Sequence, residues 1–334
     1  MTDKINILGI ETSCDETAAA VVQNGRKVLS NVISSQIDIH KKFGGVVPEI
    51  ASRAHLEIIS QIIDQALEKA NLNKNNINGI AVTNGPGLVG ALLVGVSYAK
   101  TFAFVLNKNL ISVNHIAGHI CANYLENDFE PPFICCVVSG GHTNLVYVKD
   151  YDEFENLGQT RDDAAGEAYD KVARVLNLDY PGGPKIDKLA QSGDYNKIEF
   201  PQIILDNSLD FSFSGLKSHV INFVYKNKDN ISAIKKDIAA GFQFAICQVI
   251  IKRALKACEL KSCKKIALAG GVSANSYLRK IFIEMCEKNN YEFSIPKNIF
   301  CTDNAAMIAS SGYFKFLNNK FAGLDLNAVP NLKL

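Results

Sequence analysis

Two apolar runs joined by a short polar turn occur twice in this 334-residue chain, and this repeat constrains the fold more than any other feature. The first copy extends from Ile5 to Val22 around the turn ETSCDET, and the second extends from Phe133 to Val148 around the turn SGGHT. Such an arrangement is typical of a β-hairpin. A unit that recurs within one chain indicates a duplicated fold. The sequence therefore predicts two related halves, each of which opens with a hairpin.

Helix-like and strand-like segments alternate through the rest of the chain. Apolar residues three or four positions apart predict helices, whereas short apolar runs that end at glycine or asparagine predict strands. The predicted helices span 49–70, 88–106, 163–176, 233–258, 276–288 and 304–316, and the predicted strands span 77–82 and 266–269. Strands that alternate with helices place the chain in the α/β class.

Two halves that each open with a hairpin, whose turn is rich in hydroxyl groups and backbone donors, resemble the actin-like ATPase (ASKHA) architecture. The resemblance implies duplicated lobes with an interlobe cleft that holds a nucleotide. We expect an N-terminal lobe at 1–115, completed by a C-terminal segment of about 300–334, and a second lobe at 116–299. The length agrees with this division, because a domain typically has roughly 150 residues. The fold alone implies no chemistry.

Composition and charge exclude several classes of protein. With 47% apolar and 21% charged residues, the chain is not disordered, collagen-like or a coiled-coil array. Its 35 Lys and Arg against 34 Asp and Glu leave a net charge of +1, without the basic excess of many nucleic-acid-binding proteins. The longest apolar stretch, 91–106, is shorter than the roughly 20 residues of a membrane-spanning helix, and we expect no membrane segment.

The cysteines and the N-terminus indicate the compartment. The first apolar run, Ile5 to Ile10, is too short for the apolar region of a secretory signal peptide. The nine cysteines are odd in number and contain no CxxC pair, so we expect buried thiols rather than disulfides. These features predict a cytoplasmic protein.

One pair of histidines has the spacing of a metal site. His115 and His119 are four residues apart, so on a helix both project from one face. Asp303, expected at a strand-to-helix junction, would complete a two-histidine, one-carboxylate ligand set that suits iron(II) or zinc. Spacing alone leaves two alternatives open, namely solvent-exposed histidines and an aspartate that caps a helix. Ile116 replaces the glutamate of zinc proteases, which argues against a metalloprotease.

Two glycine-rich turns are candidates for binding phosphate or a nucleotide. Gly140 and Gly141 lack a Cβ atom, so a ligand can approach their backbone N–H groups, and Ser139 and Thr143 add hydroxyl groups. The segment GGVSAN at 270–275 follows a predicted strand and opens a helix, which places N–H donors at a helix N-terminus. Both segments are also compatible with ordinary tight turns.

Other features leave their role open. Asp170 can accept hydrogen bonds from ribose hydroxyls or pair with Arg174, one helical turn away, and Gly183 is expected near the same cleft. The segment 44–55 is either a substrate loop or a turn before a helix. The lysines and arginine between 252 and 265 indicate a solvated surface, with a tRNA contact as the alternative.

Ten motifs that span nearly the whole chain resemble one family. They are ETSCDET (11–17), GGVVPEIASRAH (44–55), NGPGLVG (84–90), NHIAGH (114–119), SGGHT (139–143), DDAAGEAYD (162–170), YPGGP (180–184), FSFSGLK (211–217), GGVSAN (270–275) and TDNA (302–305). The family is that of the tRNA N6-adenosine threonylcarbamoyltransferases, also called TsaD and formerly described as glycoproteases. The sequence departs from the family pattern at none of these motifs.

The resemblance implies an actin-like acyltransferase that modifies tRNA. It would transfer the threonylcarbamoyl group from threonylcarbamoyl-AMP to the N6 amine of the adenosine 3′-adjacent to the anticodon, in tRNAs that read codons beginning with A. By similarity, His115, His119 and Asp303 bind one divalent ion, either iron(II) or zinc. The implied adenylate-binding residues are Val137, Val138, Ser139, Gly140, Gly141, Asp170, Gly183 and Asn275, with Asp187 as a neighbour. ATP or ADP would bind in the same cleft.

The resemblance leaves the general base open and implies partners. Glu11 and Asp15 are the candidates for the base, because both are close in sequence to the turn at the cleft. The bacterial members work with tRNA, a paralogous TsaB-type subunit and a small TsaE-type ATPase. Partners of this kind would supply the basic surface that a near-neutral chain lacks.

Two other functions remain as alternatives. A non-catalytic scaffold subunit of the same fold would be expected to lack the metal triad. An actin-like kinase of small molecules would leave the histidine pair without a purpose.

Overall fold

The computed structural model describes residues 4–203, 205 and 208–334. The chain divides into two compact units. The first unit comprises Met1–Pro131, Asp150–Glu153 and Pro296–Leu334, and the second comprises Pro132–Lys149 and Phe154–Ile295. His115, His119 and Asp303 therefore all belong to the first unit. The boundaries of the two expected lobes and the cleft between them stay predictions, and the units are described one at a time.

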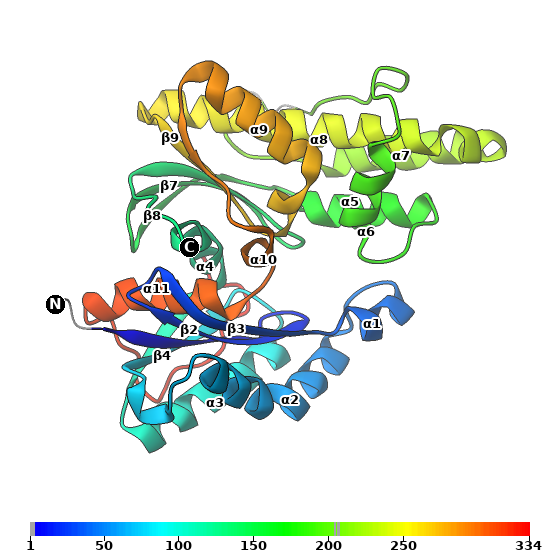
Figure 1. The fold of residues 1–334 in the computed structure, drawn as a ribbon. Coiled ribbons are helices and arrows are strands. Elements are labelled where there is room, and N and C mark those ends of the chain that lie inside the picture. Colours follow the sequence, from blue (N-terminus) through cyan, green and yellow to red (C-terminus); the bar gives the residue numbers. More distant parts are fainter. Residues whose placement is uncertain (1–3, 204, 206–207) are drawn as a thin grey trace. The chain divides into compact units, whose positions relative to one another are not determined.

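The first unit contains a five-stranded sheet with the strand order β3-β2-β1-β4-β5 (Figure 1). Its strands are β1 (Asn6–Glu11), β2 (Glu16–Gln23), β3 (Lys27–Ser35), β4 (Gly79–Gly85) and β5 (Asn109–Asn114). β1 pairs antiparallel with β2 and parallel with β4, and β5 is parallel to β4. The first predicted hairpin is thus confirmed, because β1 and β2 are its two arms.

Helices cover both faces of this sheet. The helices of this unit are α1 (Ile37–His40), α2 (Pro48–Lys69), α3 (Val89–Leu106), α4 (His115–Cys121), α10 (Asn298–Cys301) and α11 (Ala305–Leu317), with short 3-10 helices η1 (Lys41–Phe43), η2 (Lys74–Asn76) and η3 (Ala122–Tyr124). Successive side chains of a strand point to opposite faces. Leu8 accordingly packs in the cluster that contains Ile63 of α2, whereas Ile7 packs in the cluster that contains Ala309 of α11. The C-terminal helix therefore completes the core of the unit that begins with β1.

The second unit repeats the topology of the first. Its strands are β6 (Phe133–Val138), β7 (Thr143–Asp150), β8 (Glu153–Gln159), β9 (Lys265–Ala269) and β10 (Glu292–Ser294), of which only the end residues Asp150 and Glu153 belong to the first unit. Their order is β10-β9-β6-β7-β8, with β6 antiparallel to β7 and parallel to β9. The predicted duplication is confirmed, since a hairpin is extended by two parallel strands in both sheets. The fold is α/β and actin-like.

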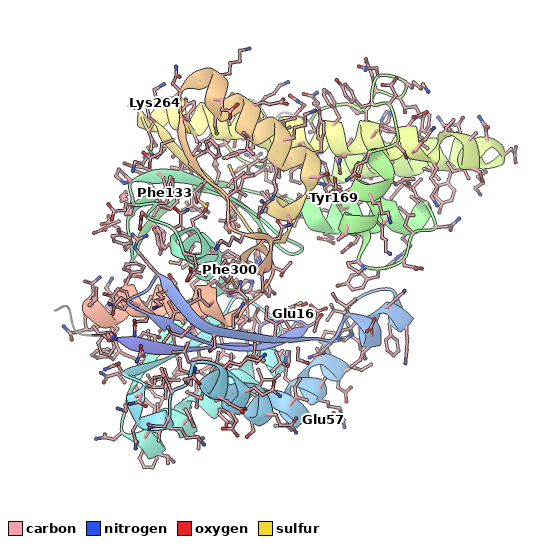
Figure 2. All side chains as sticks on the ribbon, in the orientation of Figure 1. Glu16, Glu57, Phe133, Tyr169, Lys264 and Phe300 are labelled. Atoms are coloured by element: carbon pink, nitrogen blue, oxygen red, sulfur yellow. The ribbon has the colours of Figure 1, made fainter. Side chains whose placement is uncertain are left out.

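The helices of the second unit form its core with one face of the sheet. They are α5 (Ala165–Val175), α6 (Gly182–Ala190), α7 (Ser214–Lys226), α8 (Ile231–Lys261) and α9 (Ser276–Asn289), with η4 (Lys228–Asn230) and η5 (Gly271–Ala274). Phe133 and Tyr169 are buried, whereas Lys264 is exposed at the surface (Figure 2). All nine cysteines are free thiols, eight of them buried and Cys14 half-buried, as expected from the sequence.

Two helices of the described chain are long and apolar enough to cross a membrane, Val89–Leu106 and Lys228–Lys261. This is weak evidence, because core helices of soluble proteins pass the same test. In the second helix, 78% of the apolar window is buried inside the protein, and in the first, 33% is buried. The expectation that no segment spans a membrane stays a prediction.

Candidate functional site

The histidine pair lies at the start of α4, directly after β5. The side chain of Asn114 caps this helix, because its Oδ1 accepts hydrogen bonds from the N–H groups of Ile116, at 2.8 Å, and Ala117, at 3.4 Å. The cap starts the helix at His115, so His119 lies one turn further on the same face. Both side chains are buried, and the centroids of their rings are 4.6 Å apart.

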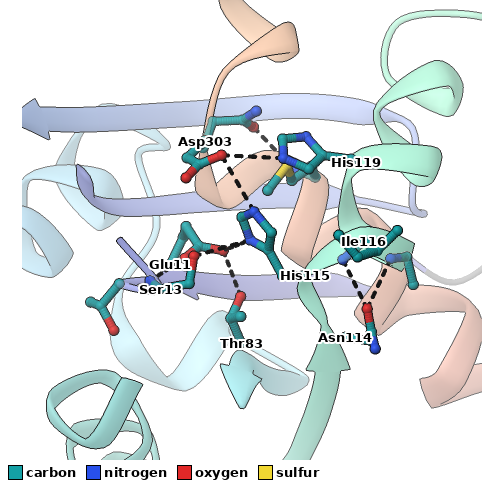
Figure 3. A network of polar contacts seen from close by, with 12 residues as sticks. Glu11, Ser13, Thr83, Asn114, His115, Ile116, His119 and Asp303 are labelled. Atoms are coloured by element: carbon teal, nitrogen blue, oxygen red, sulfur yellow. Dashed lines mark hydrogen bonds and ion pairs between the residues drawn. The ribbon is translucent and has the colours of Figure 1, made fainter. Parts of the chain in front are cut away.

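Asp303 reaches this pair from the other end of the chain. It lies between α10 and α11, so the expected strand-to-helix junction is wrong: the short helix α10 separates Asp303 from β10. The N-cap of α11 is Asn304, whose side chain accepts a hydrogen bond from the N–H of Met307 at 3.0 Å. The carboxylate of Asp303 points to the histidines instead, with Oδ1 3.2 Å from His119 Nε2 and 3.5 Å from His115 Nε2 (Figure 3).

These three side chains fit a divalent metal ion. One potential ligand atom from each lies within 4.8 Å of the others. His119 is completely buried, and neither of its ring nitrogens makes a well-formed hydrogen bond with the residues that the structure describes. A buried polar atom without a partner is costly, and coordination of an ion by Nε2 would remove that cost for this atom. Two imidazoles and one carboxylate form a ligand set that leaves further positions of an ion open.

The pKa shifts of His119 and Asp303 agree with this assignment. Burial by itself would lower the pKa of His115, but the nearby charges of Asp303 and Glu11 raise it well above its usual range, so an ion that binds to Nε2 displaces a proton. Burial lowers the pKa of His119, which leaves a neutral imidazole with a lone pair for a metal. Burial by itself would raise the pKa of Asp303, but the charge of His115 and the close contacts with both histidines hold that pKa far below its usual range. Asp303 is therefore an ionised carboxylate, the form that binds cations.

Glu11 orients His115 by contacting Nδ1, the ring nitrogen that faces away from Asp303. It is the last residue of β1 and completely buried, and its Oε2 lies 3.1 Å from His115 Nδ1 (Figure 3). The same carboxylate accepts hydrogen bonds from the Thr83 hydroxyl at 2.6 Å and the Ser13 N–H at 2.5 Å. Ser13 Oγ is also 3.1 Å from His115 Nδ1. With Nδ1 held, His115 turns its Nε2 toward Asp303, which is the usual arrangement of a carboxylate behind a metal-bound histidine.

Further acidic side chains lie in the turn between β1 and β2. Asp15 is 6% exposed and follows Cys14, which is half-buried. Burial, together with the nearby charges of Asp303 and Asp15, raises the pKa of Glu16 to about 10, so this side chain is protonated at neutral pH. A buried acid, Asp15, and a half-buried one, Glu16, thus lie close to Glu11 in the sequence.

The glycine-rich turn of the second unit is open. A Cβ atom built on Gly140 or Gly141 would meet no other atom within 4 Å. Ser139 closes the turn, because its N–H donates to the carbonyl of His142 at 2.8 Å and its Oγ accepts from the N–H of His142 at 3.1 Å. The hydroxyl of Thr143 accepts from the N–H of Ala165 at 3.0 Å and so holds the start of α5. The backbone of both glycines remains accessible to a ligand.

Two other glycines bring distant segments beside this turn. A Cβ atom on Gly166, in the first turn of α5, would come within 2.7 Å of the Gly140 Cα atom. A Cβ atom on Gly270 would come within 2.5 Å of the carbonyl oxygen of Val138, and Gly270 has a positive φ of 83°. Side chains are therefore excluded at both positions, and α5 and the segment 270–275 lie against the end of β6.

The remaining adenylate candidates either lie at helix N-termini of the same unit or contact them through their side chains. Asp170 Oδ1 accepts from the N–H of Gly182, the first residue of α6, at 2.7 Å, and a Cβ on Gly183 would meet nothing within 4 Å. Asn275 caps α9 and donates to Gln243 Oε1 at 2.7 Å. Asp187 accepts from the N–H and hydroxyl of Ser276, at 2.9 and 2.8 Å, and so ties α6 to α9.

The fold and these sites define an actin-like α/β protein with a candidate two-histidine, one-carboxylate metal centre in one unit and an open glycine-rich turn in the other. A family model described as TsaD, tRNA N6-adenosine threonylcarbamoyltransferase, matches residues 27–310. The chain belongs to this family. Curated relatives named tRNA N6-adenosine threonylcarbamoyltransferase include one from Clostridium kluyveri, 58% identical, and one from Clostridium botulinum, 57% identical. Each alignment covers 100% of this chain and 99% of the relative.

Solved structures support the fold. The HypF protein of T. kodakarensis superposes with a TM-score of 0.66 over 97% of this chain and 49% of its own, at 16% identity. A full-length HypF in a phosphate- and nucleotide-bound form gives a TM-score of 0.63 over 95% of this chain and 55% of its own, at 14% identity. At this level of identity the likeness shows the architecture and nothing more.

Several residues around the candidate metal centre were not predicted from the sequence. Ser13 and Thr83 hold Glu11 and His115, and Asn304 caps the helix that follows Asp303. Ser13 and Asn304 lie within motifs that the sequence singled out, and Thr83 directly precedes one. The signal was therefore present, but which of the polar residues in a motif face the histidines is visible only in the folded chain.

Proposed function

We propose that this chain transfers the threonylcarbamoyl group of threonylcarbamoyl-AMP to the N6 amine of the adenosine 3′-adjacent to the anticodon, in tRNAs that read codons beginning with A. The observation that carries the proposal is the set of two buried histidines, His115 and His119, and the half-buried Asp303, with Glu11 holding His115, in a member of this family. In the reaction, the amine nitrogen forms a bond to the carbamoyl carbon, the bond from that carbon to the phosphate oxygen breaks, and AMP leaves. The amine loses one proton, which the general base accepts.

We propose that His115 Nε2, His119 Nε2 and Asp303 Oδ1 hold one iron(II) ion, with zinc as the alternative that the same ligands suit. Such an ion supplies Lewis-acid stabilisation of negatively charged oxygens, a contribution of several kcal/mol. Glu11 keeps Nδ1 of His115 protonated and the ring in place. Because three donors already bond to its carboxylate, we assign Glu11 a positioning role, and Asp15 becomes the candidate for the base.

We propose that the second unit binds the adenylate. The accessible N–H groups of Gly140 and Gly141 and the helix N-terminus at Gly182 and Gly183 supply donors for phosphate oxygens. Val137 and Val138 lead into the first turn at the end of β6, and Asp170, Asn275 and Asp187 lie at or between the helix N-termini. Fixing the leaving group in this way uses binding energy to lower the reaction barrier.

We propose tRNA, a TsaB-type subunit and a TsaE-type ATPase as partners in the cytoplasm. The charge of the chain supports partners, because a net charge of +1 offers few phosphate contacts to a tRNA.

The test is transfer in vitro. The purified chain, its partner subunits, threonylcarbamoyl-AMP and unmodified tRNA are incubated, and the digested tRNA is analysed for threonylcarbamoyladenosine by mass spectrometry. We expect product from the wild type and from His219→Ala, which removes an exposed imidazole of α7, but not from His115→Ala/His119→Ala. Metal analysis of the same samples distinguishes iron from zinc. Absence of product from the wild type would favour the scaffold or the kinase, and an assay of phosphoryl transfer from ATP separates these two.

A further inference from the structure

Two more histidines of the first unit are completely buried and lie outside the ligand set, namely His40 and His55. Both belong to one chain of hydrogen bonds that joins the loop before α2 to the turn between β1 and β2. The two ends of this chain are backbone groups, the N–H of Val47 and the carbonyl of Cys14. These end groups determine the direction of every hydrogen bond between them, because an N–H can only donate and a carbonyl can only accept.

The carbonyl of Cys14 fixes the direction of donation at one end of this series of hydrogen bonds. His55 Nε2 lies 2.9 Å from the Cys14 carbonyl oxygen, so Nε2 carries a proton and donates. Burial lowers the pKa of His55, which agrees with a neutral ring whose Nδ1 accepts. The Thr17 hydroxyl, at 2.7 Å from Nδ1, and the Gln36 amide, with Nε2 at 3.4 Å, are the donors to this nitrogen.

The Val47 end gives the same direction independently. The N–H of Val47 donates to His40 Nδ1 at 3.3 Å, so in a neutral ring His40 Nε2 is the protonated nitrogen. This Nε2 donates to Gln36 Oε1 at 3.1 Å. The amide of Gln36 is thereby oriented with its Nε2 toward His55 and toward the carbonyl of Ala51, at 3.3 Å. The assignments from the two ends agree, and both histidines have the proton on Nε2.

The turn between β1 and β2, at which this series of hydrogen bonds ends, is anchored because three successive carbonyl groups of the turn accept hydrogen bonds. Leu88 N–H donates to the Ser13 carbonyl at 2.8 Å, His55 Nε2 to that of Cys14 at 2.9 Å, and Gln36 N–H to that of Asp15 at 3.0 Å. The first and third of these donors are backbone groups, which every residue except proline possesses. The middle donor is the side chain of His55, so a substitution at residue 55 can remove this hydrogen bond and leave the other two in place.

We propose that His55 is a positioning residue of the metal centre. By holding the Cys14 carbonyl, His55 fixes the turn whose first residues, Glu11 and Ser13, contact Nδ1 of His115. His55 is not one of the three ligands and acts through the backbone of the turn. The proposal rests on the metal centre of the proposed function, and its main measurements do not require turnover.

The first experiment measures metal binding by the full-length chain. His55→Leu removes the donor to Cys14, whereas the amide N–H of His55→Gln can replace it. Metal-free proteins are titrated with Co²⁺, and both the affinity and the visible absorption spectrum of the bound ion are recorded. We expect about tenfold weaker binding and an altered spectrum in His55→Leu, because partners behind metal ligands typically change affinity by about 10–100-fold. We expect His55→Gln to restore most of both.

The control is Ser30→Ala, which removes a buried hydroxyl that accepts from the N–H of Val21 in the same sheet. It should leave Co²⁺ binding unchanged. If His55→Leu does not fold, Thr17→Val removes a donor to His55 Nδ1 with little change in shape and should weaken binding by a smaller factor. Wild-type affinity and spectrum in whichever of the two variants folds would overturn the proposal, and so would a His55→Gln variant as impaired as His55→Leu.

Two further measurements separate this proposal from the proposed function. Nitrogen-15 NMR of histidine-labelled protein should show the neutral Nε2-protonated form for His40 and His55, and the Nδ1-protonated form of His55 would overturn the assignment. With active enzyme, His55→Leu should lower kcat and leave the KM for threonylcarbamoyl-AMP unchanged, because the adenylate candidates belong to the second unit. If the wild type makes no product, the proposed function fails, while Co²⁺ binding and NMR still decide the role of His55.

Discussion

Replacement of Glu11 by glutamine tests the candidate metal centre directly. One carboxylate accepts hydrogen bonds from Ser13 N–H, from the Thr83 hydroxyl and from His115 Nδ1, and it is completely buried. Glutamine has nearly the same shape, but it lacks the negative charge, and its NH₂ group cannot accept. One of the donors loses its acceptor, and His115 becomes a weaker and less well oriented ligand. We expect affinity for Zn²⁺ or Co²⁺ to fall by about 10–100-fold, or about 1.4–2.7 kcal/mol.

Affinity is measured by competition with a chelator of known strength, and urea unfolding of the same samples verifies that the variant is folded. Glu16→Gln is the matched control, because it changes a half-buried acid at the start of β2 that already carries a proton at neutral pH, given its pKa of about 10. It should bind metal within about twofold of wild type. A folded Glu11→Gln variant with wild-type affinity would refute the reasoning that Glu11 acts on the ion through His115.

Three further predictions concern the capping residue, the open turn and an ion pair. Asn304→Ala should lower the free energy of unfolding by about 1 kcal/mol, measured in urea, because α11 loses its N-cap, and no change would contradict the capping role. Gly141→Ala should leave the melting temperature unchanged, since a Cβ there meets nothing within 4 Å, yet weaken AMP binding in equilibrium dialysis by at least about tenfold, or about 1.4 kcal/mol; wild-type affinity would show that no ligand approaches this backbone. Burial by itself would raise the pKa of Asp163, but hydrogen bonds from Lys217 and Lys171 outweigh burial, so this pKa lies below its usual value. The ionised carboxylate of Asp163 therefore stabilises the folded protein above its pKa in the unfolded chain, about 3.9. This stabilisation is lost as the pH falls through the lower pKa that Asp163 has in the folded protein. Asp163→Asn should cost about 1–3 kcal/mol at pH 7 and nothing at strongly acidic pH, and a difference that does not depend on pH would contradict the ion pairs.

Local patterns were sufficient for most of the elements. The spacing of apolar residues placed a helix at 49–70, and α2 spans Pro48–Lys69. The two hairpins were predicted from the same kind of signal, and their repetition correctly indicated two sheets of one topology. These predictions succeed because a helix or a hairpin buries residues that are close in sequence, so its periodicity is written in the segment itself.

For the candidate metal centre, too, the local part was predicted from the sequence and the long-range part was not. The spacing of His115 and His119 already placed both imidazoles on one face of a helix, since four residues make about one turn. That Asp303 rather than Asn304 points toward them depends on which residue caps α11, and neighbouring polar residues look alike in the sequence.

Sequence alone thus determined the class of fold, its duplication, the family resemblance and the pair of histidines. Tertiary structure decided that Glu11 contacts His115 and accepts a hydrogen bond from Thr83. It also decided that His55 holds the turn that follows β1. The physical reason is that these contacts join strands and helices far apart in the chain. Their partners are selected by the packing of whole elements around a common core, a property that no single segment carries.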